Sequence, residues 1–543
     1  MRKISILTAC ACLFAGVSVA AQNFNESVEV TNDLLVDMSG MQRKTVPMEI
    51  PDSLYRFNLK FDYSVFDKPY RGAYEFKPYN VLFKPVDKVE PSSMLYFRAG
   101  GGFSWDYMRF SPVLDAVVTP KISDRFHMSL YQCLNGYNGY YSALRGSTDR
   151  YIRGHEYNEL VGAQGTAYLK GADLSFDVYY NGKWVRDYAL GGAPYHTLGA
   201  RLGLVSEEKR VRYMDYDLAL DFRSSNDHNY IGGLSENALS IGGRLRPYIQ
   251  SRIGATMDFD TGFDIYGGAL SSAMYYMKIT PKAAFSLGKF DFARGAGISY
   301  YSRQGKNSLY IYPDCEVSVE LFKNSLELFA GIGGGDRLNS YHSFKQHNAH
   351  YSLAYNAGAL GISRQAYDVF VGMRGVIGPF LGYNLRAGYA DNRSAVLYTL
   401  NSADVMQVSQ VYGNYRQSYA GGSLMWKSHS WDVNLGVDFN NTDIIGRLDA
   451  FDLPAWQAGL DVTYNYMGRV YAGTSLKYVS ARPSTLYEDR RQFVDWGVNA
   501  EYRFSGEAGL WMRLTNLLGQ YVEYVPFTGH RDFCMLIGVR LDF

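Results

Sequence analysis

The residues best suited to metal chemistry are three histidines that lie close together in the sequence. The stretch YHSFKQHNAHY contains His342, His347 and His350. Imidazole is a common zinc ligand, but a site needs further ligands, often cysteine or a carboxylate. The nearest carboxylate is Asp336, and none stands at ligand spacing. We interpret the three histidines as residues of a solvent-exposed surface loop and predict no metal site.

Other motifs that could do chemistry also have simpler explanations. GIGGGDR, residues 331–337, lacks the strand–loop–helix setting and the lysine of a phosphate-binding loop, and we interpret it as a hairpin end that needs positive φ. The charged stretches RQGKN, DRLN and EDRRQ are interpreted as solvated loop tips. A serine hydrolase with its site at the rim of the fold would need a serine nucleophile and a histidine base within hydrogen-bond reach. The spacing of residues in the sequence does not reveal such a pair. We predict no catalytic residue, no cofactor and no enzymatic activity.

The first residues predict export from the cytoplasm. A basic MRK start precedes an apolar stretch from Ile4, and SVAAQ then offers small residues for cleavage after Ala20 or Ala21. The alternative is that LTAC, ending at Cys10, is a lipoprotein acylation site. The apolar run before it reaches only Leu7, which is short for that purpose. We therefore predict a signal peptide over residues 1–21.

Composition excludes several classes of protein. The net charge of +1 argues against a nucleic-acid partner, which would require a basic excess. After the signal there is no apolar run of about 18 residues, so no transmembrane helix is predicted. Cys133, Cys315 and Cys534 are far apart and odd in number, so they form no disulfide framework or CxxC metal site. The 47 Tyr and 55 Gly residues indicate many strands and turns.

Alternation of apolar and polar residues predicts strands along most of the chain. In SWDVNLGVDFN, apolar side chains from Trp431 to Phe439 alternate with polar or small ones, and FVDWGVNAEYRF repeats the pattern. This period of two is typical of a strand with one apolar and one polar face. The final stretch, HRDFCMLIGVRLDF, is apolar at every second position up to Phe543. A soluble β-protein seldom ends on such a strand. Only YTLNSADVMQVSQVYG is ambiguous between helix and strand.

The connections between predicted strands alternate between short and long. The short connections are 119–124, 170–172, 206–210, 246–250, 288–289, 323–324, 376–379, 427–429, 467–468 and 505–506. The alternate ones are mostly longer: 134–157, 182–195, 224–235, 261–275, 334–364, 391–417, 441–453, 479–492 and 519–531, with tighter links at 106–108 and 302–307. In an up-and-down sheet, alternate connections fall on opposite rims, and outer-membrane barrels have tight periplasmic turns and longer outer loops.

The pattern predicts an all-β fold, an antiparallel up-and-down transmembrane β-barrel of about 22 strands of roughly ten residues. A soluble propeller would show a blade-length repeat and strands that are apolar on both faces, and neither is present. The polar positions are too many and too large for a packed interior. They suit a water-filled lumen, while the apolar positions face lipid.

The closing stretch RLTNLLGQYVEYVPFTGHRDFCMLIGVRLDF, residues 513–543, resembles the last strands of TonB-dependent receptors, with an N-L turn, a tyrosine, an arginine and a terminal phenylalanine. The segments 28–53, 61–65 and 309–341 resemble a shorter group of such barrels from Bacteroidetes. The resemblance covers most of the mature chain through loose motifs. It implies that Phe543 acts as the outer-membrane insertion signal that the β-barrel assembly machinery reads.

We predict three regions: the signal peptide at 1–21, an extended periplasmic N-terminal segment at 22–93, and the transmembrane barrel at 94–543. The receptors of the family carry a folded plug domain, whereas the roughly seventy residues before the first strand here are rich in Pro, Lys and Asp and are interpreted as extended, which puts TonB-energised import in doubt. We expect an outer-membrane barrel, in contact with outer-membrane lipids, that takes part in transport. The alternative is a non-transporting scaffold, or an assembly- or secretion-associated barrel, that binds a periplasmic or surface lipoprotein.

Overall fold

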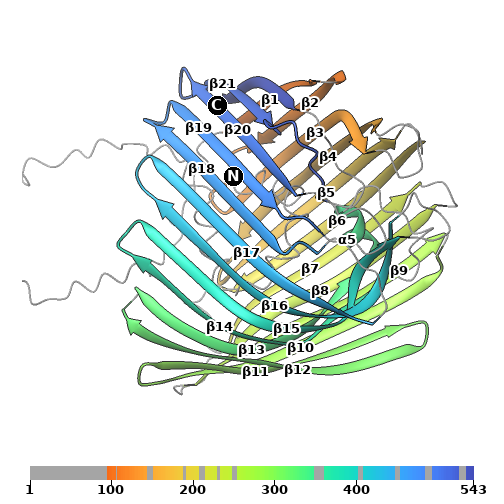
Figure 1. The fold of residues 1–543 in the computed structure, drawn as a ribbon, viewed down its shortest axis with the longest axis vertical. Helices are drawn as coiled ribbons and strands as arrows, with labels where there is room; N and C mark the ends of the chain where they lie inside the picture. Colours follow the sequence, from red (N-terminus) through yellow and green to blue (C-terminus); the bar gives the residue numbers. More distant parts are fainter. Residues whose placement is uncertain are drawn as a thin grey trace, which may run out of the picture.

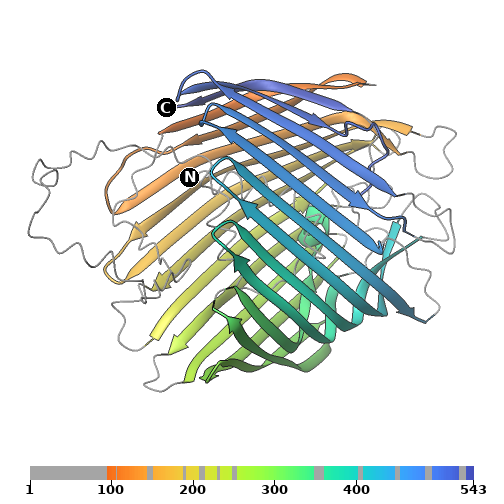
Figure 2. The ribbon, with the colours of Figure 1, turned by 60° about the vertical axis from the view of Figure 1, so that its left-hand side comes forward.

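The computed structural model describes residues 94–543 except 106, 143–150, 188–190, 207–213, 229–232, 248–252, 269, 324, 348–359, 401–407, 447–452, 483–491 and 525–532. The described chain forms one sheet of 22 antiparallel strands that closes on itself. Tilted strands wind around a wide barrel in every view (Figures 1 and 2). The predicted fold class and strand number are confirmed. The predicted signal peptide and N-terminal segment lie outside the described residues.

The first eleven strands are β1 (Leu95–Ser104), β2 (Tyr107–Val118), β3 (Phe126–Ser142), β4 (Tyr151–Tyr168), β5 (Ala172–Asp187), β6 (Gly191–Ser206), β7 (Met214–Asp227), β8 (Leu234–Pro247), β9 (Ile253–Gly268), β10 (Ser272–Leu287) and β11 (Phe290–Arg303). The others are β12 (Lys306–Phe322), β13 (Leu326–Asn339), β14 (Gly361–Ile377), β15 (Leu381–Leu400), β16 (Val408–Lys427), β17 (Trp431–Ile445), β18 (Trp456–Tyr466), β19 (Val470–Val479), β20 (Phe493–Arg503), β21 (Ala508–Thr515) and β22 (Cys534–Asp542). One helix, α5 (Tyr341–His347), follows β13.

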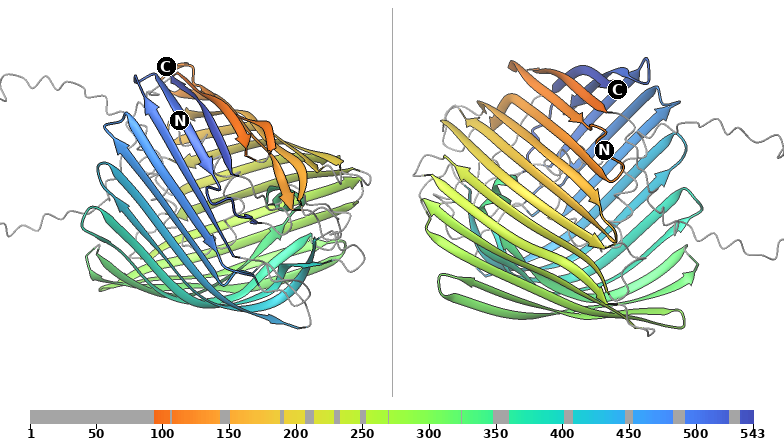
Figure 3. Two further views of the ribbon diagram at one scale, coloured as in Figure 1. Left: turned by 45° about the horizontal axis from the view of Figure 1, so that its top comes forward. Right: turned by 180° about the vertical axis from the view of Figure 1, so that it is seen from behind.

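The last strand closes the barrel against the first. β22 pairs antiparallel with β1 from Tyr96↔Asp542 to Ser104↔Cys534. The amide of Phe543 donates to the carbonyl of Leu95 at 2.8 Å. Figure 3 shows the blue end of the chain beside the orange start. Because they pair with each other, neither β1 nor β22 is left as a free edge strand of the sheet.

The connections confirm the predicted alternation of two rims, which we call the short-turn rim and the long-loop rim. The short-turn rim carries the connections from β2–β3 to β20–β21, and β1 begins and β22 ends there. Its turns lie within a few residues of their predicted places. The turn at 467–468 holds Met467 (φ 51°) and Gly468 (φ 69°), the two positive φ angles of a tight hairpin.

The predicted strand length of about ten residues is wrong, because the strands run from 8 residues in β21 to 20 in β15 and β16. The predicted connections at 182–195 and 261–275 therefore include strand ends of β5, β6, β9 and β10. The ladder continues past the apolar part of each strand toward the long-loop rim. Apolar alternation is found only in the part of a strand that lies in an apolar environment, so it underestimates the length of the whole strand.

The outward face carries a continuous apolar belt beside the short-turn rim. On β22, Met535, Ile537 and Val539 are 39–47% exposed, whereas Cys534 and Leu536 point inward and are buried. The last large apolar residues of the belt on β4, β6, β7 and β8 are Val161, Leu198, Phe222 and Leu239. The next outward residues toward the long-loop rim are Glu159, His196, Ser224 and Asn237. The belt is thus about ten residues deep, which is the length that a tilted strand needs to cross hydrocarbon.

The inward face is polar, as predicted, and is crossed by ion pairs between neighbouring strands. Arg201 of β6 lies opposite Asp221 of β7 in the register, and their charged groups are 3.0 Å apart. Arg244 and Asp258 make the same arrangement between β8 and β9 at 2.7 Å. Further opposed pairs are Arg374–Glu327, Arg364–Asp336 and Lys427–Asp432. Opposite charges across a ladder stabilise the pairing and suit a wet interior.

Within the described ranges, no helix is long and apolar enough to cross a membrane. The stretch 398–413, which the sequence left ambiguous, contributes to β15 and β16, and its middle, 401–407, lies outside the described residues.

Candidate functional site

A short helix folds into the barrel just below the long-loop rim. α5 begins after Ser340, whose side-chain oxygen accepts a hydrogen bond from the amide of Ser343 at 3.2 Å. Serine is a favoured residue before the first turn because it satisfies such an unpaired amide. Figure 1 shows α5 inside the ring of strands. A helix of seven residues is too short to be stable alone, so contacts with the wall must hold it.

The central contact is a buried ion pair. The Nζ of Lys345 lies 3.0 Å from Oδ2 of Asp227 at the end of β7, and their side chains are 1% and 0% exposed. The hydroxyl of Tyr341 donates to the same carboxylate. Burial lowers the pKa of Lys345, while the charge of Asp227 opposes that shift. Removal of one member of such a pair leaves an isolated buried charge, which is strongly unfavourable.

His342 makes a second set of contacts with the wall. Its backbone amide donates to Oε2 of Glu236 at 2.7 Å, and Nδ1 of its ring lies 2.8 Å from the hydroxyl of Tyr195. Glu236 also pairs with Arg223 at 3.3 Å. Burial lowers the pKa of His342 well below its usual value, and the charges of Arg223 and Lys183 act in the same direction. The imidazole is therefore neutral near pH 7.

The interpretation of the loop histidines as solvent-exposed is thus wrong for His342. His342 and His347 are both half-buried, and His350 lies outside the described residues. Among the residues that the structure places, no group of three histidine, cysteine or carboxylate side chains could hold a metal ion. His342 lies in a helix that is docked on the barrel wall. Asp227 and Glu236, far away in sequence, are its polar partners.

Apolar side chains complete the docking surface. The buried cluster contains Tyr195, Leu234, Tyr266, Met274, Tyr341, Phe344 and Leu360. Tyr341 and Phe344 come from α5 and the others from the wall or the start of β14. At the far end of the helix, Nζ of Lys183 donates to the carbonyl of Lys345 at 3.3 Å. Helix ends need such partners for their free carbonyl groups. The segment is therefore held by strands β5 to β10.

Both ends of the connection between β13 and β14 are also fixed. The side-chain amide of Asn339 lies 2.7 Å from the hydroxyl of Ser363 and 3.1 Å from that of Tyr412. Arg303 donates to the carbonyl of Leu360. Arg303 belongs to RQGKN, so solvation alone does not explain that motif. We call residues 339–347 and 360 together the inward segment.

A second connection, residues 516–524, folds inward near β19 and β20. Asn516 has a positive φ of 51° and makes two hydrogen bonds with the backbone of Gln520, which forms the N-L turn noted in the sequence. Val522 is fully buried against Val479 and Phe493.

The end of this connection binds the wall through polar groups. The hydroxyl of Tyr524 donates to Asp495 at 2.6 Å, and Nζ of Lys477 lies 4.2 Å from the centre of its ring. Burial raises the pKa of Tyr524. Arg482 also donates to the carbonyl of Glu523 at 2.7 Å. The lumen is therefore narrowed from two sides at the same rim.

The glycine-rich motif lies inside a strand and not at a hairpin end, so that prediction is wrong. Residues 331–337 belong to β13, and the register slips between Gly333 and Gly335, as glycine often allows at a β-bulge. Beyond the bulge Asp336 faces inward, where it binds Arg364 at 2.9 Å and the hydroxyl of Ser299 at 2.5 Å. The DRLN stretch is thus part of the wall.

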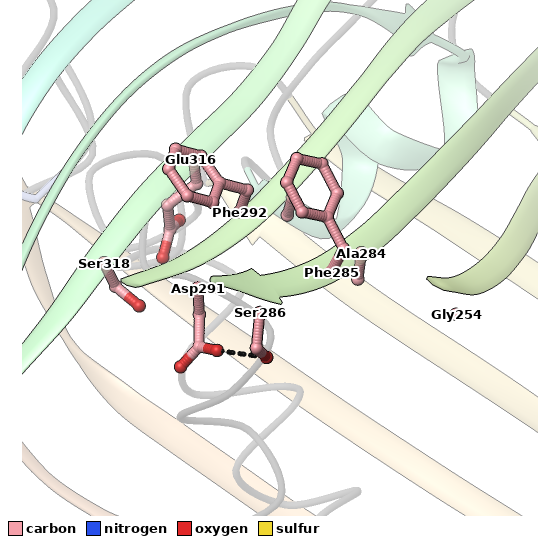
Figure 4. Close-up of a pocket in the computed structure, with 9 residues that line it drawn as sticks. Gly254, Ala284, Phe285, Ser286, Asp291, Phe292, Glu316 and Ser318 are labelled. Carbon is pink, nitrogen blue, oxygen red and sulfur yellow. Dashed lines mark hydrogen bonds between the residues drawn. The ribbon is translucent and has the colours of Figure 1, made fainter. Parts of the chain in front are cut away.

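The other candidate positions show no chemistry beyond packing. Cys133 and Cys534 are buried, Cys315 is half-buried, and none forms a disulfide. Most of EDRRQ lies outside the described residues. A hollow of about 330 Å³ opens on the inner wall of β9 to β12 near the short-turn rim (Figure 4). Ser286 there donates to Asp291 at 2.5 Å, and the lining residues include no histidine base for a serine nucleophile.

Comparison with known proteins finds similar structures but no similar sequence. No protein-family profile matches the chain, and no curated protein sequence matches it. The FrpB iron transporter of Neisseria meningitidis superposes with a TM-score of 0.64 at 10% identity, over 85% of this chain and 82% of that one. The likeness is one of fold.

Two further structures give the same result. The siderophore receptor PirA of Acinetobacter baumannii has a TM-score of 0.63 at 9% identity, over 84% of this chain and 81% of that one. The copper transporter OprC has a TM-score of 0.59 at 11% identity, over 84% of this chain and 81% of that one. These proteins are described as transporters or receptors and none as an enzyme.

Proposed function

We propose that this chain is an outer-membrane β-barrel protein that takes part in the transport of a polar solute. The observation that carries the proposal is the contrast between the two faces of one closed sheet. The outward belt is apolar over a depth of about ten residues, whereas the inward face is crossed by ion pairs such as Arg201–Asp221. Hydrocarbon outside and water inside is the arrangement that explains both faces. The shared fold of the FrpB, PirA and OprC barrels supports it.

The belt also supports an orientation. It lies beside the short-turn rim, where β1 begins and β22 ends, and outer-membrane barrels have their tight turns in the periplasm. The long-loop rim would then face the exterior. This orientation agrees with the proposed export by the signal peptide at 1–21 and with Phe543 as an insertion signal read by the assembly machinery. On the sequence resemblance, we group the chain with receptor-like barrels of Bacteroidetes.

The inward segment and residues 516–524 would then select what enters from outside. Both lie at the outer end of the lumen and both are fixed by buried contacts, among them Lys345–Asp227 and Tyr524–Asp495. The inner wall that a solute would pass carries charged groups such as those of Arg201 and Asp221. We therefore propose a polar or charged solute. The proposed function does not include a TonB-energised step.

The alternative, a non-transporting scaffold, is favoured by the same fixed contacts. A lumen that two anchored segments fill could serve to bind a periplasmic or surface lipoprotein partner. A transport protein and a scaffold differ in whether solute moves through the lumen. This can be measured with the inward segment in place and again after its anchoring contacts are removed.

Planar-bilayer conductance of the purified full chain makes that separation. The transport proposal predicts discrete current steps, which become larger when Lys345→Met and Tyr341→Phe together weaken the anchor of α5. A variant with Lys427→Met, which loses an exposed pair on the inner wall, should conduct like the native chain. Absence of current in both the native chain and the released variant would reject transport. A stoichiometric partner retained under gentle extraction would then support the scaffold.

A further inference from the structure

Among the described residues, one charged side chain, that of Arg294 on β11, interrupts the apolar belt. On β11, Ser299 points inward and is 1% exposed, while Phe290 and Ile298 point outward and are 48% and 39% exposed. Side chains alternate along a strand, so Arg294 shares the outward face with Phe290 and Ile298. Its register partners, Ala283 and Cys315, are small and uncharged. In the part of the barrel that the structure describes, no other charged side chain lies outward within eight residues of the short-turn end of a strand.

The guanidinium group is turned toward the short-turn rim. Its carbon lies 5.6 Å from the ring centre of Phe285 and 5.8 Å from that of Phe292. Both rings belong to residues nearer the β10–β11 turn, so the side chain folds back along the outer surface toward that turn. The two rings stack with centres 5.1 Å apart and form a flat apolar platform beneath the cation. Figure 4 shows both rings on the opposite side of the sheet from Ser286 and Asp291.

The contacts of Arg294 leave its charge uncompensated. Among the described residues Arg294 makes no ion pair, and its guanidinium group contacts the rings of Phe285 and Phe292. The lumen-facing residues Arg201, Arg244 and Arg374, by contrast, each have a carboxylate oxygen within 3.0 Å. A long basic side chain in a lipid-facing belt extends its charge to the headgroup level, where phosphate groups are available. Lys289, exposed in the turn that precedes β11, adds a second cation on the same hairpin.

We propose that Arg294 and Lys289 bind the phosphate of an anionic glycerophospholipid in the leaflet beside the short-turn rim. The guanidinium and the ammonium would hold the phosphate, and the stacked rings of Phe285 and Phe292 would pack against an acyl chain. The occupant is a lipid and not a free anion, because the platform is apolar and faces outward. This inference depends on the membrane placement in the proposed function and not on transport.

Native mass spectrometry of the full chain in neutral detergent, titrated with phosphatidylglycerol, tests the site. We expect Arg294→Gln to raise the lipid concentration for half-saturation of the first bound lipid roughly fivefold, since one basic residue near a lipid surface contributes about that factor. The half-saturating lipid concentration of Arg294→Lys should lie between those of the native chain and Arg294→Gln. The matched control, Arg201→Gln, removes an exposed arginine from the lumen and should leave lipid binding unchanged.

Three results would overturn the proposal. They are equal binding by the native chain and Arg294→Gln, equal binding of zwitterionic phosphatidylcholine, and displacement of the bound lipid by millimolar inorganic phosphate, which would indicate a site for the free anion. A barrel without conductance that still retains phosphatidylglycerol through Arg294 would reject transport and support the lipid site. The lipid-site proposal and the transport proposal can therefore be rejected independently of each other.

Discussion

Lys345 and Asp227 form an ion pair inside the barrel, 3.0 Å apart and shielded from water on all sides. One belongs to a connection after β13 and the other to the end of β7, so the pair fixes a loop to a distant part of the wall. Burial of both charges costs desolvation free energy, which only close geometry and further hydrogen bonds offset. The pair therefore specifies where the inward segment lies more than it stabilises the barrel as a whole.

The first prediction concerns that pair. Lys345→Met leaves the Asp227 carboxylate buried without its cation, and should lower the free energy of unfolding in lipid vesicles by about 3–5 kcal/mol. The double variant Lys345→Met, Asp227→Asn should lose less than either single variant, because neither charge is then stranded. Lys427→Met breaks an exposed pair and should cost less than about 1 kcal/mol. Additive losses in the double variant would show that the two groups do not interact.

The second prediction concerns pH. The folded chain lowers the pKa of His342 below its ordinary 6.5, so an unfolded chain takes up a proton as the pH falls through that value while the folded chain does not. The stability that this residue contributes is complete above pH 6.5 and is lost below it, at up to about 1.4 kcal/mol per pH unit. Urea unfolding between about pH 7.5 and 5.5 measures the slope.

The control for the pH prediction is a histidine outside the lumen contacts. His342→Gln should flatten the slope relative to the native chain, whereas His429→Gln, in an exposed turn, should leave it unchanged. An identical slope for all three proteins would mean that other groups cause the pH dependence.

The third prediction concerns closure of the barrel. Gly538 of β22 lies in register with Gly100 of β1, and the buried ring of Trp511 covers both. A Cβ at Gly538 would lie 2.1 Å from the carbonyl oxygen of Ala99 and 2.6 Å from Trp511. Gly538→Ala should therefore cost roughly 1–3 kcal/mol or more by overpacking, measured as the yield of folded barrel on unheated gels.

The matched control is Gly436→Ala on β17, where an added Cβ has no atom within 4 Å. It should fold like the native chain. Equal losses for both alanine variants would indicate a general sensitivity of the sheet and not a steric conflict at the seam.

The fourth prediction concerns Phe543 as an insertion signal. Phe543→Ser keeps the backbone hydrogen bond to Leu95, so a structural role predicts little change, whereas loss of the signal predicts less barrel in the outer-membrane fraction. Phe504→Ser is the matched control, since Phe504 is 56% and Phe543 53% exposed. An equal decrease for both would assign the effect to lost lipid contact, and no decrease for Phe543→Ser would reject the signal.

Sequence patterns predicted the barrel better than its interior. Alternation in stretches such as 431–439 and the tight turn at Met467 and Gly468 depend on neighbouring residues, which is why the strand number and the short turns were predictable. The strand ends beyond the belt were missed because their outward residues, such as His196, are polar. The backbone ladder there continues without an apolar stripe.

The inward segment was not predicted, because its partners are separated from it by more than a hundred residues. Nothing in the local sequence links His342 to Glu236 or Lys345 to Asp227. A weak signal was present: Ser340 as a helix cap, followed by Tyr341 and Phe344 three residues apart on one face. Such a pattern inside a polar loop indicates a docked helix and not a solvated one.

The measurement that tests the central claim most directly is the accessibility of single cysteines along β17 in intact membranes, in a chain whose own cysteines are replaced. We predict that cysteines at Asn434 and Asp438, on the inward face, react with a water-soluble maleimide. Cysteines at Leu435 and Val437, on the outward face, should resist it, and a fluorophore there should be quenched by brominated lipid. Reaction at the outward positions, or uniform reaction at all four, would contradict a wet lumen enclosed by a lipid-facing sheet.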